Sequence, residues 1–220
     1  MTTSGGWHSA SRSRSTDLPA ATHAPLTWGG SAGRLRYRAT VARGLLIIDI
    51  QRDYFPGGAY PLVEPEAAAE TARRLLDAFR AAGEPVIHLK HVWDAPDAAF
   101  MRPGTDGIEI HPLVAPAEGE PVIEKEHPNG FLGTDLAGEL ATRDVDALVV
   151  AGMMSSMCVD ATVRAAVDQG LTATVVHDAC AAPDLAFGGA TIPGPTVHGA
   201  FMAALGDGYA AVVDADSLLS

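Results

Sequence analysis

The chain has 220 residues, of which 47% are hydrophobic and 19% are charged, a composition that suits one globular domain with a substantial core. Its formal net charge of -12 argues against a nucleic-acid-binding protein. No apolar run approaches the roughly 20 residues of a membrane-spanning helix, and two cysteines are too few for a disulfide framework, so we expect a cytoplasmic protein without membrane contact.

The N-terminal segment differs in composition from the rest of the chain. Residues 1–44 carry six arginines against Asp17 alone, whereas residues 45–220 carry 9 basic and 26 acidic groups. Ser, Thr, Gly, Ala and Pro are abundant in the first 33 residues, which show no helical or strand period. We expect residues 1–40 to be a mobile extension of a folded domain at residues 41–220. An arm that binds nucleic acid or an anionic surface is the alternative.

From residue 44 onward, short apolar runs alternate with amphipathic stretches. Continuous apolar runs are typical of parallel strands that are buried on both faces. Six such runs predict strands at residues 44–49, 85–90, 121–125, 146–152, 172–178 and 210–214. Strands that alternate with helices favour a doubly wound, Rossmann-like α/β sheet that is mainly parallel.

Two of the stretches between these strands carry helix signals. Residues 64–83 have Pro65 and acidic side chains at the start and Arg80 and Gly83 at the end, which are the usual start and stop signals of a helix. Residues 158–170 repeat this pattern. Residues 187–196 contain too much Gly and Pro for a backbone assignment, and we expect the surrounding loop to influence specificity.

Three reactive side chains fall at predicted strand ends, where doubly wound sheets form their sites. Asp49 ends the first strand, Lys125 ends the third, and Cys158 follows the fourth at a helix start. Each residue alone has an ordinary structural explanation, but together they suggest a nucleophilic site. A helix start and a nearby ammonium lower a thiol pKa, and Asp49 can accept the proton of Cys158. Cys180 lacks this context, and we interpret it as structural.

These residues lie in segments that resemble a known family. "LLIIDIQRDYF" (45–55), "EKEHPNGF" (124–131) and "VVAGMMSSMCVDATVRAA" (149–166) are similar to the three motifs of the isochorismatase-like cysteine hydrolases, which include nicotinamidases and N-carbamoylsarcosine amidohydrolases. The resemblance covers roughly residues 44–214. It implies a three-layer α/β/α sandwich with a central six-stranded sheet, a catalytic Asp49, Lys125 and Cys158, and a homo-oligomer, either a dimer or a tetramer.

The resemblance also implies a particular backbone geometry before the cysteine. A cis peptide bond would join Met153 to Met154, and the N–H groups of Met154 and Cys158 would form the oxyanion hole.

The chain departs from the nicotinamidase pattern at the metal site. Nicotinamidases carry an Asp-x-His and a further His that bind a divalent metal, whereas residues 86–100 read "VIHLKHVWDAPDAAF". His88 and His91 are three apart, a spacing that does not converge on a strand and its following loop. We therefore expect no metal and no cofactor. His88 is interpreted as a strand residue with its hydrogen bonds satisfied.

Several side chains near these motifs are candidates for binding a small-molecule substrate. His91 and Trp93 are expected at the mouth of the pocket, and Phe55 and Phe131 are expected in its walls. Asn129 either offers its amide to the substrate or serves as the turn residue of "PNG".

The predicted activity is hydrolysis of an amide or related carbon–nitrogen bond through a thioester. Cys158 would attack the carbonyl carbon, Asp49 would move the proton, and Lys125 would orient the pair. The alternatives are an isochorismatase-type vinyl ether hydrolase and a non-catalytic small-molecule binder.

Overall fold

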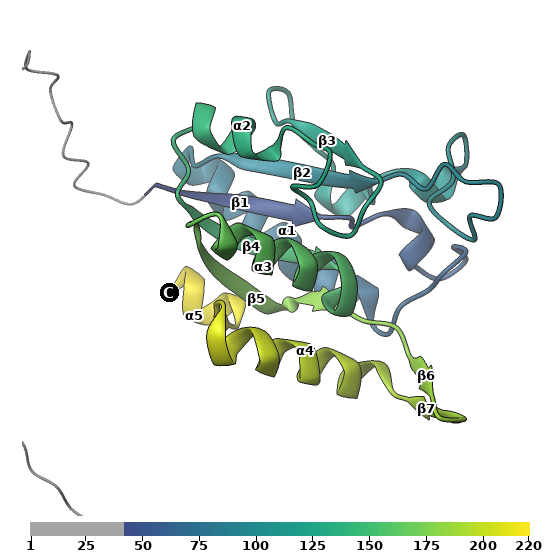
Figure 1. Cartoon of the computed structure of the whole chain (residues 1–220). Coiled ribbons are helices and arrows are strands. Elements are labelled where there is room, and N and C mark those ends of the chain that lie inside the picture. The colour runs from purple at the N-terminus through teal and green to yellow at the C-terminus, as the bar shows by residue number, and fades with distance from the viewer. Residues whose placement is uncertain (1–41) are drawn as a thin grey trace, which may run out of the picture. The chain divides into compact units, whose positions relative to one another are not determined.

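The computed structural model describes residues 42–220. The extension predicted for residues 1–40 lies outside the described residues. In Figure 1, a parallel sheet lies between two layers of helices. Within the described range, no helix is both long and apolar enough to cross a membrane.

Six strands form the sheet in the order β3-β2-β1-β4-β5-β8, and all neighbouring strands are parallel. The strands are β1 (Arg43–Ile48), β2 (Val86–His91), β3 (Val122–Lys125), β4 (Ala147–Met153), β5 (Thr172–Ala181) and β8 (Ala211–Val213). The predicted fold class is therefore confirmed. The strand order reverses between β1 and β4, and ligands of doubly wound sheets bind at such a switch point.

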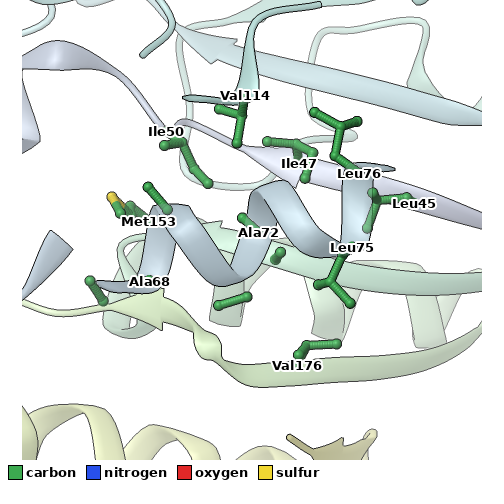
Figure 2. Close-up of a cluster of buried hydrophobic side chains, with 14 of the residues drawn as sticks. Leu45, Ile47, Ile50, Ala68, Ala72, Leu75, Leu76, Val114, Met153 and Val176 are labelled. Carbon is green, nitrogen blue, oxygen red and sulfur yellow. The ribbon is translucent and has the colours of Figure 1, made fainter. Parts of the chain in front are cut away.

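The helices divide between the two faces of the sheet. One face packs against α1 and α5, and the other against α2, α3 and α4. Their bounds are α1 (Pro65–Ala82), α2 (Leu136–Thr142), α3 (Asp160–Asp168), α4 (Gly194–Gly208) and α5 (Ala215–Leu219). Along β1, Leu45 and Ile47 join the α1 cluster drawn in Figure 2, whereas Leu46 and Ile48 join the opposite cluster. Strands buried on both faces in this way account for the continuous apolar runs in the sequence.

Several elements were not individually assigned from the sequence, which led us to expect helices between the strands only in general. They are the helices α2, α4 and α5, and an antiparallel hairpin formed by β6 (Leu185–Phe187) and β7 (Ala190–Ile192). Gly188 and Gly189 join the two hairpin strands with φ values of 61° and 80°. Such left-handed pairs match the right-handed twist of a tight hairpin. Residues 187–196, which the sequence analysis left without a backbone assignment, therefore belong to a hairpin and the start of α4.

Short helical turns complete the fold on the side where the strands end. The 3-10 turns are η1 (Arg52–Tyr54), η2 (Asp106–Ile108) and η3 (Pro112–Val114), and η4 (Ser155–Val159) is a π-turn.

Gly152 allows β4 to approach β1 closely just before the π-turn. Its φ is 148°, and a Cβ at this position would lie 2.1 Å from the carbonyl oxygen of Ile48. Backbone atoms of a central strand cannot move aside easily, so this close approach requires glycine.

We predict that Gly152→Ala lowers the free energy of unfolding by about 2 to 5 kcal/mol, because the added methyl group clashes with the backbone of β1. Gly199→Ala is the matched control, since Gly199 lies on an exposed part of α4 and a Cβ there meets nothing within 4 Å. This control is expected to raise stability by about 0.5 to 1 kcal/mol. Urea unfolding measures both changes, and equal stability of the two variants would contradict the packing argument.

Candidate active site

Four adjacent strands each bring one polar side chain to the same edge of the sheet. Asp49 directly follows β1, His91 ends β2, Lys125 ends β3, and Cys158 lies in η4 after β4. The side chains of Asp49 and Lys125 are both 0% exposed. The structure therefore brings together the three residues that the sequence analysis singled out, and adds His91 to them.

Lys125 is the centre of this group. Its Nζ lies 2.6 Å from Oδ2 of Asp49, 3.1 Å from Nδ1 of His91 and 3.1 Å from the carbonyl oxygen of His127. Burial lowers the pKa of Lys125, but the neighbouring Asp49 carboxylate and Cys158 thiol outweigh it, and the pKa is raised overall. Lys125 is therefore an ammonium, which donates and cannot accept.

His91 is neutral in this arrangement. Burial lowers the pKa of His91 below its usual value, and the positive charge of Lys125 lowers it further. Because the ammonium of Lys125 donates to Nδ1, the ring proton of His91 lies on Nε2. His91 thus offers the site a neutral ring.

Cys158 contacts both members of the buried ion pair. The side chain is 3% exposed, and its thiol lies within hydrogen-bonding reach of Asp49 and Lys125. Burial raises the pKa of Cys158, Asp49 raises it further, and Lys125 lowers it, so that the thiol pKa is well above its usual value. The sequence-based expectation of a lowered pKa is opposite to this direction, because burial and the carboxylate outweigh the helix start and the ammonium.

The resting site is therefore a neutral thiol beside a carboxylate. Oδ1 of Asp49 is buried and has no other hydrogen-bond partner within residues 42–220. It can accept the proton that Cys158 loses during attack on a substrate.

The turn that carries Cys158 is anchored on both sides. The peptide bond between Met153 and Met154 is cis, as the resemblance implied. In the π-turn, the N–H of Val159 donates to the carbonyl oxygen of Met154 at 3.2 Å. The oxyanion hole assigned to the N–H groups of Met154 and Cys158 stays a prediction.

Ser155 connects the same turn to the neighbouring elements, a link that the sequence analysis missed. Its fully buried hydroxyl lies 3.1 Å from the carbonyl oxygen of Ala181 in β5 and 2.8 Å from Nδ1 of His198 in α4. The position of Cys158 therefore depends on contacts from elements that lie far away in the sequence.

The segment after β1 holds the opposite side of the site. The side-chain amide of Gln51 accepts the N–H of His91 at 2.8 Å and donates to its carbonyl oxygen at 2.9 Å. The carboxylate of Asp53 accepts the N–H of Met101 at 2.6 Å and that of Ala59 at 3.0 Å. One short segment thus fixes both the end of β2 and the loop that follows it.

A cavity of about 240 Å³ opens onto Cys158. Its walls are mostly aromatic and apolar side chains from the loops after β1, β2, β3 and β4, namely Tyr54, His91, Trp93, Phe100, Glu126, Pro128, Met154, Met157 and Cys158. The rings of Trp93 and Phe100 meet edge to face, with centroids 5.3 Å apart. Of the predicted binding residues, His91 and Trp93 line this cavity. The sequence analysis missed Tyr54, Phe100, Glu126, Pro128 and Met157.

The other three predicted binding residues lie elsewhere. Phe55 stacks on His111, with ring centroids 3.8 Å apart, and faces a different cavity. Asn129 accepts the N–H of Phe131 at 2.9 Å, which is the turn role weighed for it above. Phe131 packs against the core between the sheet and the layer of α2, α3 and α4. None of the three lines the cavity at Cys158.

Two further residues of the sequence analysis are buried in strands. His88 lies in β2, with Nε2 3.0 Å from the carboxylate of Glu120, but its buried Nδ1 has no hydrogen-bond partner within residues 42–220, so the expectation that its hydrogen bonds are satisfied holds for one ring nitrogen and is wrong for the other. Cys180 is buried in β5, and burial raises its pKa to about 12.

One group of residues within the described range could in principle hold a metal ion. Asp49, His91 and Cys158 each offer one donor atom, and these three atoms lie within 4.8 Å of one another. The ammonium of Lys125 forms an ion pair with Asp49 and a hydrogen bond with His91, so it occupies the position that a metal cation would need. These donors therefore do not fit a metal site while Lys125 is charged.

Comparison with known proteins identifies the family. The sequence model of the isochorismatase domain family matches residues 43–192 of this chain. The chain belongs to the isochorismatase family. The isochorismatase family protein YddQ of Bacillus subtilis is 50% identical over 175 residues, which cover 80% of this chain and 97% of YddQ.

Solved structures of the isochorismatase family have the same fold. A putative isochorismatase hydrolase from Oleispira antarctica matches with a TM-score of 0.79 and 46% identity, over 83% of this chain and 98% of that one. N-carbamoylsarcosine amidase from Thermoplasma acidophilum matches with a TM-score of 0.66 and 26% identity, over 80% of this chain and 97% of that one. Isochorismatase-family members are hydrolases, and some of them act on carbon–nitrogen bonds. This chain is therefore an isochorismatase-family hydrolase.

We predict that Asp49→Asn lowers the thiol pKa of Cys158. The substitution removes the negative charge that disfavours the thiolate and leaves the ammonium of Lys125 that favours it. The rate of alkylation of Cys158 by iodoacetamide, followed against pH by peptide mass spectrometry, measures this pKa. In the wild type the rate should rise only above the ordinary thiol pKa of about 8.5, and in the variant it should rise at lower pH. An unchanged midpoint would contradict the assignment of Asp49 as the neighbour that holds the thiol protonated.

Proposed function

We propose that this protein hydrolyses an amide or a related carbon–nitrogen bond of a small molecule through a thioester on Cys158. The observation that carries the proposal is the contact of one thiol with both a buried carboxylate and a buried ammonium, at a cavity large enough for a single-ring compound.

The reaction begins with a proton transfer inside the buried group. Sγ of Cys158 bonds to the carbonyl carbon of the substrate while its proton passes to Asp49, and a tetrahedral oxyanion forms. Asp49 then gives this proton to the leaving nitrogen, the carbon–nitrogen bond breaks, and an amine or ammonia departs. A thioester remains on Cys158.

The second half of the reaction uses the same carboxylate. Asp49 takes a proton from a water molecule, whose oxygen attacks the thioester carbon. The carbon–sulfur bond breaks, the proton returns to the sulfur of Cys158, and the carboxylic acid leaves. Lys125 remains an ammonium throughout and keeps the carboxylate in place.

The raised thiol pKa is compatible with this sequence of steps. Proton transfer from Cys158 to Asp49 exchanges one anion for another beside the same ammonium, so the net charge of the buried group does not change. In a site with little water, a step without new net charge avoids a large desolvation cost.

The geometry favours amide hydrolysis over vinyl ether hydrolysis. A vinyl ether is hydrolysed by protonation of a carbon followed by addition of water, which requires an acid but no sulfur nucleophile. Here the thiol lies next to the carboxylate and opens onto the cavity, an arrangement that suits attack on a carbonyl carbon.

We predict that Cys158→Ala lowers kcat/KM by at least about 1000-fold on any carbon–nitrogen substrate of the enzyme, because no nucleophile remains. The assay follows ammonia or amine release from a panel of primary amides, lactams, ureas and carbamoyl compounds, and pyruvate release from isochorismate, which contains no nitrogen. Cys180→Ser is the matched control and is expected to stay within a few-fold of the wild type. Full activity of Cys158→Ala would refute the thioester mechanism, and turnover of isochorismate alone would favour the vinyl ether alternative.

Exhaustive treatment with EDTA is predicted to leave hydrolysis unchanged. The ammonium of Lys125 occupies the position between the potential metal donors Asp49 and His91. The measurement compares kcat before and after dialysis against the chelator, together with the metal content of the protein. Activity that is lost with EDTA and restored by a divalent cation would contradict this assignment.

A further inference from the structure

We infer that the cavity at Cys158 accepts uncharged or cationic compounds and rejects anionic ones, and that Glu126 is the residue responsible for this selection. As a statement about substrates, the inference rests on the proposed hydrolysis. As a statement about the cavity, it can be tested without any turnover.

Among the described residues, the cavity lining contains one charged side chain that is not part of the buried group. Glu126 is exposed at the lining and forms no ion pair with any residue within 42–220. No Lys or Arg from the described part of the chain lines the cavity. The charges of Asp49 and Lys125 lie 2.6 Å apart and largely cancel. A ligand therefore meets an excess of negative charge.

The remaining polar groups of the lining are neutral. Burial, together with Cys158 and Asp49, raises the pKa of Tyr54 well above its usual value, so its phenol keeps its proton. Burial and Lys125 lower the pKa of His91, which therefore carries no positive charge at neutral pH. These two side chains can form hydrogen bonds with a substrate but cannot neutralise a carboxylate.

The cations in the described part of the chain are already engaged with carboxylates. Nine of the ten Lys and Arg residues at 42–220 lie in ion pairs, namely Arg43, Arg52, Arg73, Arg74, Arg80, Lys90, Lys125, Arg143 and Arg164. The tenth, Arg102, faces a neighbouring cavity that shares only Phe100 with the catalytic one. Among residues 42–220, no free cation is therefore placed to bind an anionic substrate.

The shape and chemistry of the walls narrow the ligand class further. Trp93, Phe100, Pro128 and the two methionines Met154 and Met157 provide apolar surface on several sides of the cavity. A flat apolar group fills such a space and gains from contact with the aromatic rings. The substrate class that fits is an amide on a flat apolar group, either uncharged or with a cationic substituent that can reach Glu126.

Cysteine modification by charged reagents tests the selection directly. The cationic 2-(trimethylammonium)ethyl methanethiosulfonate and the anionic 2-sulfonatoethyl methanethiosulfonate differ mainly in charge, and each transfers its thioalkyl group to a thiol with release of methanesulfinate. Their rates at Cys158, read by peptide mass spectrometry and normalised to 2-mercaptoethanol, should differ by about 10-fold or more in favour of the cation at low ionic strength. The ratio should fall with added salt.

Matched variants assign the effect to one side chain. Glu126→Gln should reduce the ratio of the two rates by about 3- to 10-fold. Glu124→Gln removes the same charge two residues away, from a side chain that pairs with Lys90 and does not line the cavity, and it should leave the ratio unchanged. Equal or faster modification by the anion, or a ratio that responds to Glu124→Gln and not to Glu126→Gln, would overturn the inference.

Three amides of similar size separate this inference from the proposed function. Benzamide and 3-(aminomethyl)benzamide should be hydrolysed with a kcat/KM at least about 10-fold above that of 3-carbamoylbenzoate. Preferred hydrolysis of the anionic amide would overturn the inference. If none of the three is hydrolysed while the modification rates still favour the cation, charge selection by the cavity stands and the proposed function fails on these substrates.

Discussion

The buried ion pair between Asp49 and Lys125 is the interaction on which the site depends. Removing two charges from water costs several kcal/mol for each ion, and such a pair is stable only when its geometry is good and its remaining hydrogen bonds are satisfied. Here the two side chains are fully buried and 2.6 Å apart, and Lys125 also has His91 and the carbonyl oxygen of His127 as acceptors. The pair joins the end of β1 to the end of β3 across β2, which lies between them.

The same interaction determines what Cys158 can do. A carboxylate held in place by an ammonium remains available as a proton acceptor, and burial keeps the thiol protonated until a substrate arrives. The ammonium also takes the space that a metal ion would need. In the proposed mechanism, sulfur is the nucleophile and the nearest proton carrier is Asp49. The aromatic and methionine walls surround the space in front of Cys158 that a substrate would occupy.

The sequence predicted the parts of this arrangement that follow from strand periodicity and topology. All six strands of the sheet were found within a few residues of their bounds, and carboxyl ends of parallel strands meet at one edge, so the convergence of Asp49, Lys125 and Cys158 could be anticipated. The side chains that line the cavity could not be predicted in this way. Asp49 has a φ of 49° and the chain then enters a 3-10 turn, so strand alternation stops there. As a result, Tyr54 faces the cavity, whereas its neighbour Phe55 does not.

Contacts between distant segments account for the other differences. The loop after β2 brings Phe100 to the cavity because Asp53 holds the N–H of Met101, a contact between residues 48 apart in the sequence. The direction of the thiol pKa depends on burial, which a motif does not reveal. The hairpin at residues 185–192 depends on two left-handed glycines in a segment whose composition suggests only a loop.

The most direct test of the account is detection of the acyl-enzyme. The Asp49→Asn variant and the wild type are mixed with a substrate amide and quenched in acid within milliseconds to seconds. Mass spectrometry then measures the mass of the intact protein, and peptide mapping locates any added group. The account predicts that the wild type gains the mass of the acyl group on the peptide containing Cys158, that hydroxylamine removes it, and that Asp49→Asn accumulates little or none. Rapid turnover by the wild type without any acyl group on Cys158, or with the group on Cys180, would contradict it.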